Sequence, residues 1–106
     1  MPKKRLLFVE TTPLGHQISL SRDRWREIVR FKHPAMGGHE SEVQQCLSDP
    51  DVICASAKNP DVHLYYRAGT KGFVCVVVGG DDPAKRFIIT AYFTRAQKKG
   101  QILWTK

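Results

Sequence analysis

Five β-branched and aromatic runs fill the second half of the chain, and short turns rich in Gly, Pro and Asn separate them. Connections this short cannot hold a crossover helix, so consecutive runs are expected to pair as neighbours. This pattern predicts an antiparallel meander of four or five strands. The predicted strands are Val52–Ala57, Val62–Arg67, Gly72–Val78, Arg86–Phe93 and Gln101–Thr105.

A first helix is predicted from Arg22 to Lys32, where apolar residues recur at helical spacing. Ser21 is suited to cap its N-terminus, because a serine hydroxyl accepts a hydrogen bond from a free backbone N–H. His33-Pro34 ends it, because proline disfavours helical backbone in the residue before it.

A second helix follows Gly37-Gly38, with His39 or Ser41 as its cap. Its buried face is predicted to carry Val43, Cys46 and Leu47. The turn residues of Ser48-Asp49-Pro50-Asp51 then end it.

These elements predict one α+β domain over residues 1–106, with two N-terminal helices packed on one face of the sheet. Residues 1–20 are expected to form an extended arm or short strands, residues 21–48 the helices and residues 52–106 the sheet. The opposite face of the sheet is left to solvent or substrate.

Alternation along two of the strands places polar and aromatic side chains together on one side. In Val62–Arg67, Leu64 and Tyr66 are predicted to pack, while Tyr65 points outward. The resulting open face is expected to be basic, hydroxyl-rich and aromatic. Its residues are His63, Tyr65, Arg67, Arg86, Thr90, Tyr92 and Thr94.

Basic residues outnumber acidic ones by 17 to 10, which gives a net charge of +7. They gather between Arg22 and Lys32 and again from Arg95 to Lys106, and such clusters attract polyanions. The predicted partner is RNA, although a solvated surface explains many basic runs. The residues predicted to contact nucleic acid are Arg22, Arg24, Arg30, Tyr65, Arg86, Thr94 and Arg95. Tyr65, Tyr92 and Trp104 could stack on unpaired bases.

Three cysteines, an odd number, stand in apolar contexts, which favours free buried thiols in a reducing compartment. The apolar run Leu6–Val9 is too short for a signal peptide or a membrane span. We therefore expect a cytoplasmic protein that has no membrane partner.

Cleavage of RNA without a metal requires a group that exchanges protons with the 2′-OH and a positive charge beside the phosphate. His33 is the histidine best placed for this role, and the alternative is a helix-terminal histidine that interacts with the helix dipole. His16, His39 and His63 look like ordinary solvated histidines. Their spacing matches no zinc motif, so neither a metal nor another cofactor is predicted.

Several short motifs, in one order along the chain, resemble the phage and prophage nuclease domains of the barnase, EndoU, colicin D and RelE-like superfamily. They cover nearly the whole chain from residue 18 onward. The motifs are Leu20–Ile28 (LSRDRWREI), His33-Pro34, Ser48–Asp51 (SDPD), Leu64–Arg67 (LYYR), Val74–Val78, Ile88–Thr94 (IITAYFT) and Leu103-Trp104.

The resemblance implies a metal-independent endoribonuclease, often a toxin of a toxin–antitoxin or phage-conflict system. It implies catalytic roles for His33, Arg67, Thr90 and Tyr92, with Arg22 or Arg24 positioning the RNA backbone. Attack by the 2′-OH would leave a 2′,3′-cyclic phosphate, and an acidic antitoxin or inhibitor protein would be the partner. Two alternatives stay open: a non-catalytic basic module that binds nucleic acid, and a protein-interaction domain that docks an acidic partner.

Overall fold

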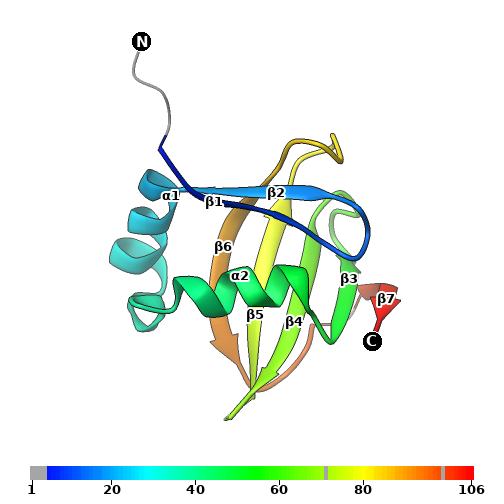
Figure 1. Ribbon diagram of the computed structural model, residues 1–106. Helices are drawn as coiled ribbons and strands as arrows, with labels where there is room; N and C mark the ends of the chain where they lie inside the picture. Colours follow the sequence, from blue (N-terminus) through cyan, green and yellow to red (C-terminus); the bar gives the residue numbers. More distant parts are fainter. Residues whose placement is uncertain (1–4, 71, 99) are drawn as a thin grey trace.

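The computed structural model describes residues 5–70, 72–98 and 100–106. Their strands form one seven-stranded sheet in the order β1-β2-β6-β5-β4-β3-β7 (Figure 1). The strands are β1 Leu6–Thr11, β2 Gln17–Ser21, β3 Val52–Ser56, β4 His63–Gly69, β5 Gly72–Gly79, β6 Arg86–Thr94 and β7 Gly100–Thr105. The helical elements are α1 Arg22–Glu27, a π-helical turn Ile28–Lys32, a 3-10 turn Pro34–Met36 and α2 Glu40–Ser48.

The predicted antiparallel meander of four or five strands is wrong, because the sheet is larger and mixed. Residues 1–20 were expected to form an arm or short strands, and β1 and β2 pair there as an antiparallel hairpin. This hairpin joins the edge of β6, where Ile18 and Ser19 pair in parallel with Arg86 and Phe87. The short-connection argument missed this pairing, because β2 and β6 are distant in the sequence.

β7 also departs from the meander, because it pairs with β3 and not with β6. Residues 95–98 lead away from β6, and the Lys98 backbone N–H donates a hydrogen bond of 2.9 Å to the Tyr66 hydroxyl. Figure 1 shows the chain passing behind the sheet to reach β7 at the far edge. The face that was expected to be open is therefore partly covered.

The first helical segment begins as predicted, since the Ser21 hydroxyl accepts a hydrogen bond of 3.1 Å from the Arg24 backbone N–H. The predicted helix Arg22–Lys32 is α-helical only from Arg22 to Glu27. A π-helical turn, Ile28–Lys32, continues it as far as His33. α2 lies across the middle strands in Figure 1 and buries Val43, Cys46 and Leu47 against them, as predicted.

Apolar side chains pack on both faces of the sheet. The helix-covered face holds the main core, in which Tyr65, Val76 and Ile88 are buried. The other face holds a smaller cluster around Tyr66 and Cys75. Both faces therefore contribute to stability, and neither is left entirely to solvent.

The prediction that Tyr65 points outward is wrong. Tyr65 is fully buried on the helix-covered face, and its hydroxyl donates a hydrogen bond of 3.0 Å to the Thr12 hydroxyl. Burial of the phenol raises the pKa of Tyr65. Strict alternation still held along β4, but the two sides were assigned the wrong way round: Tyr65 lies on the face that α2 covers, whereas Leu64 and Tyr66 lie on the other face.

No helix among the described residues is long and apolar enough to cross a membrane.

Candidate functional site

The side chain of His33 lies against the ring of Tyr92, a residue of β6. His33 ends the π-helical turn, and its ring centroid is 5.2 Å from that of Tyr92. Lys98 Nζ lies 5.8 Å from the centroid of the same tyrosine ring. The imidazole of His33 and the ammonium group of Lys98 therefore both lie next to the Tyr92 ring. We call His33, Tyr92 and Lys98 the His33 cluster.

The hydroxyls of Thr90 and Tyr92 point inward on the same face of β6. Both oxygen atoms are buried and form no hydrogen bond with the described residues. Burial, together with the neighbouring Cys75 thiol, raises the pKa of Tyr92, so its phenol stays protonated at neutral pH. At the His33 cluster, the groups that can meet a ligand are therefore the imidazole, the ammonium group and the tyrosine ring.

Arg67 does not join the His33 cluster, although the family resemblance groups it with His33. It faces α2, on the side of the sheet opposite Tyr92, and donates to Asp49 at the C-terminus of that helix. Arg67 Nη1 lies 3.3 Å from the Asp49 carbonyl oxygen and 3.4 Å from its Oδ2. Lys106 Nζ lies 3.1 Å from Asp49 Oδ1. These contacts favour a structural role for Arg67.

Replacing Arg67 with alanine is expected to lower the free energy of unfolding by about 1 kcal/mol, because the C-terminus of α2 loses a donor. The ion pair itself adds little, since Asp49 is half exposed and solvent screens it. Urea denaturation measures this change. An Arg67→Ala variant that unfolds like the unaltered chain would contradict the structural role.

The arginines of the first helical segment divide between two sides. Arg22, Arg26 and Arg30 line a cavity of about 390 Å³ next to Leu7 of β1. Arg24 lies on another side, where it pairs with Glu27 at 3.3 Å. Among the described residues, neither Arg22 nor Arg30 forms an ion pair. Their positive charges are therefore free to neutralise an anionic partner.

The other four residues predicted to contact nucleic acid, Tyr65, Arg86, Thr94 and Arg95, lie outside the arginine-lined cavity. Tyr65 and Arg86 are buried, so neither can stack on a base or meet a phosphate in this conformation. The Thr94 hydroxyl donates a hydrogen bond of 3.0 Å to the Ala96 carbonyl, which shapes the turn after β6. Arg95 is exposed in the same turn. Only Arg95 of these four keeps a free charged group on the surface.

The prediction that His63 is an ordinary solvated histidine is wrong, because His63 is buried in a polar cluster at the other end of the sheet. His16 and His63 stack with their ring centroids 5.7 Å apart, and Arg86, only 5 % exposed, lies beside them. The Arg86 guanidinium donates to the Asp61 carbonyl, while both histidine Nδ1 atoms and Arg86 Nε find no partner among the described residues. Burial and the arginine charge lower the pKa of His63 to about 4 and also lower that of His16.

The three cysteines are free and buried, as their apolar contexts suggested. Burial raises the pKa of the Cys46 thiol, which donates weak hydrogen bonds to the Tyr65 and Val74 carbonyls. Such a thiol is a poor nucleophile at neutral pH. Within residues 5–70, 72–98 and 100–106, no three His, Cys, Asp or Glu side chains are grouped so that they could hold a metal ion.

Comparison with known proteins finds no match: no family model, no curated protein and no solved structure is similar to this chain.

Proposed function

We propose that this protein is an endoribonuclease that cleaves RNA without a metal, through attack of the 2′-OH on the adjacent phosphate. The observation that carries the proposal is the His33 cluster, in which an imidazole and an ammonium group meet at one tyrosine ring. These are the two groups that such a reaction requires, a proton acceptor and a fixed positive charge. The net charge of +7 favours a polyanionic substrate.

In this mechanism His33 accepts the proton of the 2′-OH as that oxygen forms a bond to phosphorus. The bond from phosphorus to the 5′ oxygen breaks, and the departing oxygen takes a proton from solvent. Lys98 neutralises the charge that builds up on the phosphate oxygens. The products are a 2′,3′-cyclic phosphate and a free 5′-OH.

The arginine-lined cavity beside β1 is a second observation in favour of this proposal, because it offers positive charges to the RNA backbone. Arg22 and Arg30 lack ion-pair partners among the described residues, and each phosphate that they neutralise releases counterions. Their place on the first helical segment, which leads directly to His33, would hold the strand near the His33 cluster. An acidic inhibitor protein could occupy the same basic surface.

Incubation of the purified protein with RNA in excess EDTA tests the proposal. We expect cleavage that survives chelation and leaves 2′,3′-cyclic phosphate ends, which end-specific enzymatic labelling detects. Cleavage that stops in EDTA, or that leaves 3′-OH ends, would contradict this mechanism.

A non-catalytic module that binds nucleic acid is the second candidate. The inward-facing hydroxyls of Thr90 and Tyr92 favour it, because they leave the His33 cluster with few groups that could act on a substrate. This candidate predicts intact RNA and an affinity that falls steeply with salt concentration.

A further inference from the structure

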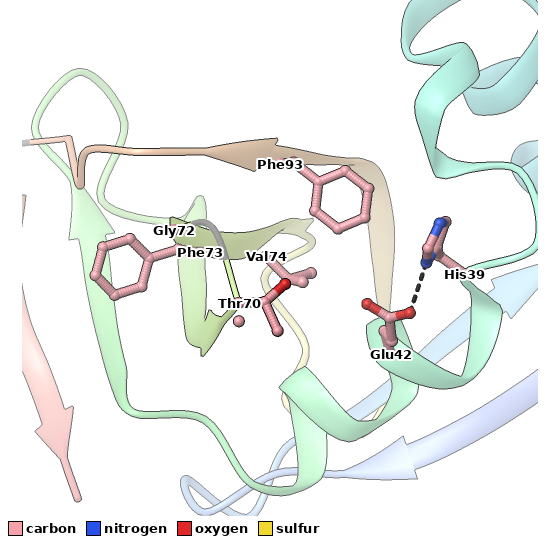
Figure 2. Close-up of a pocket in the computed structure, with 8 residues that line it drawn as sticks. His39, Glu42, Thr70, Gly72, Phe73, Val74 and Phe93 are labelled. Atoms are coloured by element: carbon pink, nitrogen blue, oxygen red, sulfur yellow. Dashed lines mark hydrogen bonds and ion pairs between the residues drawn. The ribbon is translucent and has the colours of Figure 1, made fainter.

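A cavity of about 570 Å³ opens on the helix-covered side of the sheet, the side opposite the Tyr92 ring. It lies between the first turn of α2, the end of β4 with Thr70, the start of β5 and the end of β6 (Figure 2). In Figure 2 the side chains of His39, Glu42, Thr70, Val74 and Phe93 surround this space. A concave site with apolar walls and a few convergent polar groups is the usual form of a small-molecule site.

Phe93 supplies a flat apolar wall. Its side chain is 43 % exposed, although it stands on a face of β6 whose other residues help to form the main core. The ring of His39 meets it edge to face, with centroids 5.0 Å apart and planes at 89°. Val74 is buried at the base of the same space. A planar ring that stacked on Phe93 would remove this apolar surface from water.

His39 and Glu42 supply the polar side of the cavity. His39 Nδ1 lies 2.5 Å from Glu42 Oε1, which fixes both side chains at the start of α2. A carboxylate has about four lone-pair sites, so Glu42 can still accept hydrogen bonds from a ligand. The cavity therefore combines a flat apolar wall with an anionic acceptor, and it fits a planar heterocycle that bears N–H donors.

We propose that this cavity binds a nucleobase that carries an exocyclic amino group, which donates to Glu42 while the ring stacks on Phe93. The inference rests on the proposed ribonuclease function and adds a base-recognition subsite to it. Tyr92 and Phe93 are consecutive residues of β6 and point to opposite faces, so the His33 cluster and this cavity flank the same end of one strand. Uracil, whose N–H lies between two carbonyl groups, suits a carboxylate less well.

Titration with AMP, GMP, CMP and UMP tests the subsite, with ribose 5-phosphate as a probe that lacks a base. We expect calorimetry to show tighter binding of the amino-bearing nucleotides than of UMP or ribose 5-phosphate. Phe93→Ala should weaken AMP, GMP and CMP binding about tenfold, through the lost stacking. Phe31→Ala is the matched control, because Phe31 is 76 % exposed on the π-helical turn and should leave binding unchanged.

Glu42→Gln provides a second variant, which should narrow the difference between the amino-bearing nucleotides and UMP. Equal binding of AMP and ribose 5-phosphate, or unchanged binding by Phe93→Ala, would overturn the subsite. Equal binding of UMP and the other three would overturn the amino-group preference. Mononucleotide binding is measured without cleavage, so a chain that cleaves RNA but binds no mononucleotide refutes the subsite alone. A chain that binds them but leaves RNA intact refutes only the cleavage.

Discussion

Replacing His33 with alanine is expected to lower the rate of RNA cleavage by about 10²–10⁴-fold, which is the usual contribution of a positioned proton acceptor. The fold should persist, because His33 is only partly buried and stands in a connection between helical turns. Initial rates on a fluorescent oligoribonucleotide in EDTA measure the change, and thermal unfolding checks the fold.

Two substitutions of Tyr92 distinguish a structural role of its ring from a chemical role of its hydroxyl. Its hydroxyl is buried without a hydrogen-bond partner among the described residues, so Tyr92→Phe should cleave at nearly the unaltered rate. Tyr92→Ala removes the ring that His33 and Lys98 share and should lower the rate sharply. A large loss in Tyr92→Phe would instead assign the phenol a chemical role.

Lys98 offers a direct test of the charge beside the phosphate. Lys98→Ala keeps the backbone N–H that bonds to Tyr66, so the connection to β7 should hold while the ammonium group is lost. Lys58→Ala is the matched control, because Lys58 is an exposed lysine in the turn after β3. Equal rates in these two variants would remove Lys98 from the site.

Local chemistry accounts for the parts of the fold that could be predicted from sequence. Ser21 caps α1 through a bond three residues along the chain, and Pro34 ends the helical run before it. Asp49 similarly closes α2 within one turn. Each of these signals depends on neighbours in the sequence, so no knowledge of the tertiary structure was needed.

The errors came from contacts between distant parts of the chain. Ile18 and Arg86 pair in parallel, and no turn length or local preference specifies such a pairing. A register shift at Val77/Val78 also interrupts the alternation in β6, so that Ile88 packs in the main core together with Ala91. Alternation was reliable only from Thr90 onward, where the ladder is regular.

The residues of the candidate site also differ in whether local sequence or distant contacts determine their surroundings. His33 was selected for its local setting, whereas the stacking of His16 on His63 joins the β1–β2 turn to the first residue of β4, far away in the sequence. Lys98 was noted only as part of a basic run, because nothing near it in the sequence points to Tyr92. Arg67 looked available on an alternating strand, and only the packing of α2 reveals its bond to Asp49.

The His16–His63–Arg86 cluster, in which His63 and Arg86 are buried, makes a second large effect predictable, a loss of stability in acid. The pKa of His63 falls from its ordinary 6.5 to about 4 in the folded chain, because burial and the charge of Arg86 disfavour the imidazolium form. The nearby Asp61 carboxylate opposes this only in part. Below pH 6.5 the unfolded chain therefore binds a proton at His63 while the folded chain stays neutral.

The free energy of unfolding should accordingly be highest above pH 6.5, fall by about 3 kcal/mol as the pH drops toward 4, and show no further loss from this group below that. His16, whose pKa is lowered for the same reasons, shifts the balance in the same direction. Urea denaturation at a series of pH values between 7.5 and 4 measures the slope.

His63→Gln should flatten this dependence, because the amide does not titrate, whereas His39→Gln should retain it. If His63→Gln loses as much stability between pH 6.5 and 4 as the unaltered chain, another group controls the acid response. If the loss disappears, the cluster limits the acid stability of this fold. The β1–β2 turn, which carries His16, would then be expected to open first, since in the described part of the chain β2 pairs with β6 only at Ile18–Arg86 and Ser19–Phe87.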